Sequence, residues 1–268
     1  MNNRMPPRTL FQRAVFSTLI ASAFTCLGMA PATASTITFE SLLPSAHDSG
    51  VTLDEAGYSM LLVEGPVAAY LGLVGATGTV VNGGDPFSCD VAVCPSGNSS
   101  NYLTVLNDGA VTLTRANHNG FFTLLGLDFA FVTPAPVVDG NYGLLQLAGI
   151  TSDGHSVSTA LNFPGQDGDG TFTFGSATLD PAFRALVFSS LTINACLFIE
   201  PGTCSNSVDS PAFNEAQFAL DNILLGEVPE PASILLAGMG VAALGWSRRR
   251  ARPLAGLSRF AVTSLKGA

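Results

Sequence analysis

The sequence predicts an all-β body, folded as an antiparallel β-sandwich, between two apolar terminal segments. Short runs of apolar and β-branched residues recur through the body, and glycine, asparagine, aspartate and proline separate them. The turn signals include Asn82-Gly83-Gly84-Asp85, Asn107-Asp108-Gly109 and Asp139-Gly140. Strands at this spacing, joined by such turns, are typical of a sandwich.

The expected strands follow from alternating apolar residues. They are 36–40, 101–106, 110–114, 121–132, 144–150, 156–161, 171–174 and 218–225. Asp153-Gly154 predicts a hairpin turn between two of them. The longer apolar run at 121–132 indicates a strand buried on both faces or a strand pair, and 54–63 fits either a helix or a strand. The polar stretches 89–101 and 198–213 are expected to be surface loops.

The first 34 residues have the three parts of a secretory signal peptide. The basic residues are Arg4, Arg8 and Arg13. An uncharged apolar run follows at 14–27, and Ala32-Thr33-Ala34 matches a small-x-small cleavage site. Ser35 is therefore the predicted mature N-terminus, and we expect export by the Sec translocon.

The other end also has three parts in order. Pro229, Glu230 and Pro231 precede an apolar stretch at 232–247, and then come Arg248, Arg249 and Arg250. The apolar stretch has no charge and is slightly shorter than the about 20 residues of a membrane-spanning helix. By the positive-inside rule the arginines stay in the cytoplasm, which puts the body on the far side of the inner membrane.

This order resembles the PEP-CTERM sorting signal across 228–252. The resemblance implies that the segment is a transient anchor, which an exosortase-type membrane protease recognises at Pro229, Glu230 and Pro231 and removes. The expected organisation is a signal peptide at 1–34, a β-sandwich domain at 35–226, the sorting signal at 227–252 and a cytoplasmic tail at 253–268.

The exported body is strongly acidic. All 20 acidic residues lie between Glu40 and Glu230, where Arg115 and Arg184 are the only basic residues besides histidine, so 35–230 carries −18 against −9 for the whole chain. Phosphate binding needs clustered lysine and arginine, so we exclude nucleic acid as a partner. Neutral glycans, cationic surfaces and calcium remain, although an acidic surface also simply keeps a secreted protein soluble.

Four cysteines remain after removal of the signal peptide, in two close pairs. In an oxidising compartment their spacing favours two disulfides, Cys89–Cys94 and Cys196–Cys204, among the three possible connectivities. A zinc site is disfavoured because no histidine lies near either pair and neither spacing is C-x2-C.

The last predicted strand contains Gln217-Phe218-x-x-Asp221. With the opening Ile37-Thr38-Phe39-Glu40, this motif resembles the PEP-CTERM proteins named for QFxxD. The same two strands resemble lectin-like jelly rolls and MAM-type sandwiches, whose terminal strands lie side by side and whose acids there often ligate calcium. The resemblance implies calcium ligands at Glu40, Asp221 and Asn222. The alternative is that Asp221 caps a bend and Asn222 supports a turn.

A second calcium candidate is Asp167-Gly168-Asp169-Gly170, although Thr178 stands where an EF-hand has its glutamate, and an ordinary turn is the alternative. No catalytic residue stands out. The histidines are scattered at 47, 118 and 155, and neither H-E-x-x-H nor G-x-S-x-G is present. We therefore expect a protein that is not an enzyme.

The resulting hypothesis is an exported, exosortase-processed protein of the cell surface or extracellular matrix, with a structural or adhesive role in exopolysaccharide or biofilm. The first alternative is a lectin-like glycan-binding module. The body has no tryptophan, so this alternative predicts that Tyr58, Tyr70, Tyr102 and Tyr142 gather on one sheet face. The second is a secreted hydrolase, which predicts perturbed carboxylates or a His–Ser pair in one cleft.

Overall fold

The computed structural model describes residues 34–72, 75–85, 88, 93–117, 120–132, 143–200, 203–209, 215–228, 239–240 and 243. Residues 1–33 of the predicted signal peptide, Pro229-Glu230-Pro231, Arg248-Arg249-Arg250 and the tail 253–268 lie outside this range. Within 232–247 the described residues are Met239, Gly240 and Ala243, which are helical. No helix in the described part of the chain is long and apolar enough to cross a membrane.

The first sheet has the strand order β2-β5-β6-β14-β8, and its neighbours are antiparallel. These strands are β2 (Ser45–Asp48), β5 (Ala76–Asn82), β6 (Asn101–Val105), β14 (Phe218–Val228) and β8 (Phe121–Phe131). Two short strands extend the sheet: β1 (Ala34–Ile37) pairs with β14, and β11 (Gly175–Ser176) pairs with β8. The first and last strands therefore lie side by side, as predicted.

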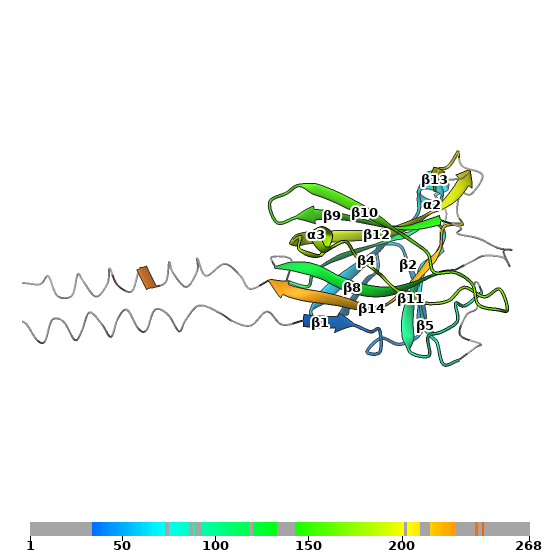
Figure 1. Cartoon of the computed structure of the whole chain (residues 1–268), viewed down its shortest axis with the longest axis horizontal. Coiled ribbons are helices and arrows are strands. Elements are labelled where there is room, and N and C mark those ends of the chain that lie inside the picture. Colours follow the sequence, from blue (N-terminus) through cyan, green and yellow to red (C-terminus); the bar gives the residue numbers. More distant parts are fainter. Residues whose placement is uncertain are drawn as a thin grey trace, which may run out of the picture. The chain divides into compact units, whose positions relative to one another are not determined.

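The second sheet has the order β10-β9-β12-β7-β4-β3 and is also antiparallel. Its strands are β10 (Ser156–Asn162), β9 (Gly143–Thr151), β12 (Phe188–Glu200), β7 (Ala110–Arg115), β4 (Tyr58–Val63) and β3 (Thr52–Glu55), with β13 (Thr203–Ser205) on the end of β12. Among the described residues, one register pair between β8 and β12 joins the two sheets. In Figure 1 the strands β9, β10 and β12 lie above β8, β14 and β1.

The core lies between the two sheets, and both contribute to it. Leu103, Phe129 and Leu220 come from the first sheet, and Leu113 and Ile193 come from the second. Two short helices, α2 (Pro66–Leu71) and α3 (Pro181–Arg184), bury Val67 and Phe183. Because side chains alternate across a strand, one face of each sheet fills this core and the other faces away from it. On the first sheet that other face carries a second, smaller buried cluster of Val81, Tyr102, Ala130, Val132 and Ala219. The predicted antiparallel β-sandwich is confirmed.

The ambiguous segment 54–63 forms the hairpin of β3 and β4. Its two turn residues, Ala56 and Gly57, have φ angles of 51° and 82°. Two successive residues in the left-handed region make the tight turn that suits the twist of a hairpin. The local backbone geometry thus decides in favour of strands.

Three expectations for local structure were wrong. The segment 171–174 makes only two isolated bridges, Gln166 with Phe172 and Ser96 with Thr173. The Phe172 ring packs edge-on against Phe131, with 4.9 Å between the ring centroids. The predicted loop 198–213 begins within β12 and includes β13. The opening strand ends at Ile37, and Glu40 lies in the turn after it.

Candidate functional site at the terminal strands

Asp221 is fully buried within β14, and its carboxylate accepts several hydrogen bonds. Its Oδ2 accepts from Asn98 Nδ2 at 2.7 Å and from Ser100 Oγ at 2.8 Å. Its Oδ1 accepts from the backbone N–H of Asn222 at 2.7 Å. A carboxylate only accepts hydrogen bonds, and these groups around that of Asp221 are all donors. Two of them come from Asn98 and Ser100, so the contacts hold the segment before β6 against the last strand.

A second carboxylate, that of Asp128, lies opposite Asp221 in the register of β8 and β14. The register shifts just after Asp221, where Asn222 has a φ of 47°. Asn222 Nδ2 donates to Asp128 Oδ2 at 2.9 Å, and Ser176 Oγ donates to Asp128 Oδ1 at 2.5 Å. Asn222 therefore supports a bend between two acids.

The pKa of Asp221 is raised, chiefly because burial disfavours the charged carboxylate. The hydrogen bonds from Asn98 and Ser100 act in the opposite direction, whereas the like charge of Asp128 adds to the rise. Desolvation and hydrogen bonding thus shift the pKa of Asp221 in opposite directions, and desolvation has the larger effect.

Glu40 contacts the segment before β6 at Asn101, close to the residues that contact Asp221. Its Oε1 accepts from the backbone N–H of Asn101 at 2.8 Å. The residue before it, Phe39, is buried with a φ of 59°, which turns the chain after β1. The structure therefore brings Glu40 and Asp221 to one short segment, 98–101, although each binds a different residue of it.

Calcium at Glu40, Asp221 and Asn222 stays a prediction. Calcium takes six to eight oxygen ligands, and the oxygens of Asp221 face N–H and O–H donors in this arrangement. Within the described ranges no group of three or more histidine, cysteine, aspartate or glutamate residues could hold a metal ion. Calcium binding there requires some of these donors to turn away.

The second calcium candidate forms a hydrogen-bonded turn. Asp167 Oδ1 accepts from the backbone N–H groups of Asp169 and Thr171, each at 3.0 Å. Its Oδ2 accepts from Ser96 Oγ at 2.8 Å. The Ser96 hydroxyl and then the Thr171 N–H lower the pKa of Asp167. These bonds are those of a turn-forming aspartate.

Two tyrosines are not where a glycan-binding platform needs them. Tyr58 is fully buried in the core between the sheets, and Tyr102 is fully buried in a separate apolar cluster, against which Phe174 packs, whereas Tyr70 is exposed on α2. Tyr142 lies outside the described residues. The expectation that the tyrosines gather on one sheet face is therefore wrong for Tyr58 and Tyr102, because their rings are buried in two different apolar clusters.

The two described histidines, His47 and His155, lie on different sheets. His155 is exposed in the β9–β10 turn near Asp153, with 3.6 Å between Nε2 and Oδ2, and His118 lies outside the described residues. His47 Nε2 does lie 3.1 Å from Ser45 Oγ, on the exposed edge strand β2. However, Ser45 Oγ also donates to the backbone oxygen of Leu43 at 3.0 Å, so the backbone competes for its proton.

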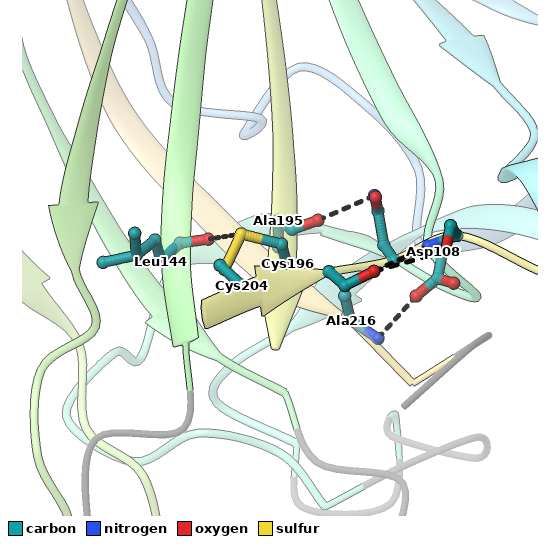
Figure 2. Close-up of a disulfide and its surroundings, with 9 residues drawn as sticks. Asp108, Leu144, Ala195, Cys196, Cys204 and Ala216 are labelled. Atoms are coloured by element: carbon teal, nitrogen blue, oxygen red, sulfur yellow. Dashed lines mark hydrogen bonds between the residues drawn. A yellow bond between two sulfur atoms is a disulfide. The ribbon is translucent and has the colours of Figure 1, made fainter. Parts of the chain in front are cut away.

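Cys196 and Cys204 form the predicted disulfide, with their Cα atoms 5.5 Å apart. Figure 2 shows that the bond joins β12 to β13. Asn206 Nδ2 donates to the backbone oxygen of Ala195 at 3.0 Å and holds the same connection. Cys94 is disulfide-bonded too, but Cys89 lies outside the described residues, so the first predicted pairing stays a prediction.

Sequence reasoning missed a second buried aspartate. Asp108 follows β6 and is 3% exposed, and its Oδ1 accepts from the backbone N–H of Ala216 at 2.7 Å. In return the Asp108 N–H donates to the Ala216 oxygen at 3.2 Å (Figure 2). The motif Asn107-Asp108-Gly109 signalled the turn, but no local signal links it to Ala216.

The central part of the outer face of the second sheet is neutral across five strands, and charged residues lie only at its margins. Asp54 of β3 is exposed there and accepts from Ser59 Oγ of β4 at 2.5 Å, and the exposed Glu200 ends β12. One register row runs through Leu61, Thr112, Thr192, Ala148 and Ser158, from β4 to β10. The hydroxyls of Thr112 and Thr192 lie 3.0 Å apart within it. The segments 58–63, 110–114, 191–195, 143–151 and 156–162 contain no acid or base. This neutral central part contrasts with the −18 charge of the body.

Arg115 links the second sheet to the end of β14. Its Nη1 lies 3.0 Å from Glu227 Oε1, and its guanidinium lies 4.7 Å from the centre of the Tyr58 ring. Glu227 is the residue before Val228, with which β14 ends. The ion pair therefore holds the strand end that leads directly into Pro229.

Comparison with known families identifies the C-terminal segment. The model of the PEP-CTERM protein-sorting motif matches residues 227–250. The chain therefore carries the sorting motif predicted above, which marks a secreted protein that an exosortase processes at the membrane. Among curated proteins, none matches this sequence.

Three solved structures show distant similarity. The enzymatically active domain of tailspike protein 4 from bacteriophage CBA120 is 13% identical with a TM-score of 0.29, over 65% of this chain and 20% of its own. A family 16 carbohydrate-binding module is 17% identical with a TM-score of 0.26, over 56% and 84%. The module TmCBM61 in complex with β-1,4-galactotriose is 8% identical with a TM-score of 0.25, over 70% and 92%. This chain spans about a fifth of the tailspike chain.

Proposed function

We propose that this chain is a non-enzymatic structural or adhesive component of an extracellular polysaccharide matrix. It crosses the inner membrane through the Sec translocon, stays anchored by its sorting tail with the body in the periplasm, and reaches the cell surface or matrix after an exosortase removes that tail. The sorting motif at 227–250 supports the route.

The observation that carries the proposed role is the neutral central part of the outer face of the second sheet, across β4, β7, β12, β9 and β10. Serine, threonine, asparagine and glutamine side chains can exchange hydrogen bonds with the hydroxyl groups of a neutral glycan. The acids elsewhere on the body repel anionic polymers and keep the protein soluble. The face therefore favours a neutral polysaccharide as the matrix contact, even though Tyr58 and Tyr102 do not contribute.

Charge placed on this face tests the proposal. Thr192→Glu puts a carboxylate in the centre of the row, and Thr178→Glu makes the same change at an exposed position outside it. The chain released by a host that has an exosortase is sedimented with an insoluble neutral glucan and with anionic alginate. We expect wild type and Thr178→Glu to sediment with the glucan and not with alginate, and Thr192→Glu to lose most of its binding to the glucan. Equal binding by both variants would contradict the proposal.

Calcium is a separate part of the proposal. A ligand that binds only the folded state at 100 times its dissociation constant adds about 2.7 kcal/mol to stability. Thermal unfolding in excess EGTA and in millimolar calcium measures this shift. Glu40→Ala is the informative variant, because Glu40 is exposed and makes one side-chain hydrogen bond. If calcium raises the unfolding temperature of wild type and Glu40→Ala equally, Glu40 is not a ligand.

A further inference from the structure

We propose that two copies of this chain associate edge to edge through β10, so that their second sheets form one continuous antiparallel sheet across a twofold axis at Thr159.

The first argument is that β10 differs from the other edge strands. It has seven residues and pairs with β9 alone among the described strands (Figure 1). The other described edge strands, β1, β2, β3, β11 and β13, have four residues or fewer. Short edge strands, charges and prolines protect sheet edges from pairing with other chains. With the sequence Ser-Val-Ser-Thr-Ala-Leu-Asn, β10 has no such protection.

The second argument is the direction of the backbone groups. At the start of the hairpin the N–H of Thr151 donates to the oxygen of His155 at 2.9 Å. Hydrogen-bonded and non-hydrogen-bonded pairs alternate along an antiparallel ladder. In the register of β9 and β10, Val157, Thr159 and Leu161 therefore bond to β9. The N–H and C=O groups of Ser158 and Ala160 point to the open edge.

The third argument is that the strand is complementary to itself. When Thr159 lies opposite its own copy, Ser158 lies opposite Ala160 and can exchange two backbone hydrogen bonds with it. Val157 then lies opposite Leu161. Both are partly buried and pack against the core at this edge, so each copy covers the half-exposed apolar side chain of the other. An isologous interface of this kind closes into a dimer.

The fourth argument concerns charge. β10 has no charged residue, so no like charges meet in the interface. The repulsion between the two acidic bodies acts over longer distances, and salt screens it beyond about 8 Å at physiological ionic strength. Association through β10 is therefore expected to strengthen as salt is added.

A single cysteine tests the arrangement in the full chain. Residues opposite each other in a non-hydrogen-bonded antiparallel pair have Cα atoms about 4.5 Å apart, which lies within the range of disulfides. Thr159→Cys, exported with its own signals into an oxidising compartment, should give a dimer of twice the monomer mass on a non-reducing gel. Ala148→Cys is the matched control, since Ala148 is exposed on β9, opposite Ser158.

A second variant separates pairing from random collision. Ala160→Pro removes an N–H that points away from β9, a position where edge strands tolerate proline, whereas Ala160→Thr keeps it. Added to Thr159→Cys, the proline should abolish the cross-link and the threonine should preserve it. Formation of the Cys196–Cys204 disulfide reports that each variant has folded. Lack of cross-linking by Thr159→Cys, equal cross-linking by Ala148→Cys, or persistence with the proline would overturn the proposal.

Discussion

At the scale of single residues, Asp221 illustrates how a motif residue can serve the fold. Gln217, Phe218 and Asp221 of the QFxxD motif are all buried; Phe218 and Asp221 lie in β14, and Gln217 directly precedes it. Asp221 orders the segment before β6 through Asn98 and Ser100. The motif therefore holds the last strand to the rest of the first sheet, whatever ligand this region binds.

Removal of this carboxylate should destabilise the protein. Asp221→Ala leaves the donors of Asn98, Ser100 and Asn222 without their acceptor, and buried unsatisfied donors cost about 1–3 kcal/mol each when no water replaces the partner. We expect a loss of about 2–4 kcal/mol in the free energy of unfolding, measured by urea denaturation. Asp169→Ala, at an exposed turn position, should change it by about 0.5 kcal/mol or less. Similar losses for the two variants would show that the network contributes little.

The pH dependence of stability should carry the sign of the Asp221 shift. Burial raises the pKa of this carboxyl in the folded protein above its ordinary value of 3.8. A carboxyl with a raised folded-state pKa stabilises the fold at low pH, and this contribution is lost as pH rises from the unfolded to the folded pKa. Wild type should therefore lose stability relative to Asp221→Asn as pH rises from about 3.8. Urea denaturation of both proteins over a pH series measures the difference. A rise in the stability of wild type relative to Asp221→Asn as pH increases would contradict the assignment.

At the scale of elements, the disulfide stabilises a strand pair. Cys196 and Cys204 are eight residues apart and join β12 to β13, which has three residues. Closing a loop of this length in the unfolded chain is worth about 2–3 kcal/mol. The double variant Cys196→Ala/Cys204→Ala should therefore lose about 2–3 kcal/mol in the free energy of unfolding, seen as a lower midpoint of guanidinium denaturation. An unchanged midpoint would mean that the hydrogen bond from Asn206 to Ala195 and the ladder suffice.

At the scale of the whole molecule, the last strand connects the fold to its processing. β14 ends at Val228, which pairs with Phe121, and Pro229 follows immediately. Proteases act best on exposed, extended chain, so a motif that adjoins a paired strand is harder to reach. The ion pair of Arg115 and Glu227 adds to this restraint.

A linker should relieve this restriction. Insertion of Gly-Ser-Gly-Ser between Val228 and Pro229 is expected to speed tail removal several-fold in a host with an exosortase, followed by pulse-chase labelling. The same insertion between Asp153 and Gly154, in the exposed β9–β10 turn, lengthens the chain equally and should leave the rate unchanged. Equal rates for both insertions and wild type would show that the folded body does not limit processing.

The sequence by itself determined the features that depend on local order. The β9–β10 hairpin follows from Asp153-Gly154, the disulfide from the spacing of Cys196 and Cys204, and the sorting motif from consecutive residues at 227–250.

Only the tertiary structure decided which distant residues meet. Asn98, Ser100 and Asp128 converge on Asp221 through strand pairing. The same pairing aligns the neutral row from Leu61 to Ser158 and leaves β10 at an open edge. Alternation along one strand reveals which side chains share a face, but strand order and register depend on packing across the whole core.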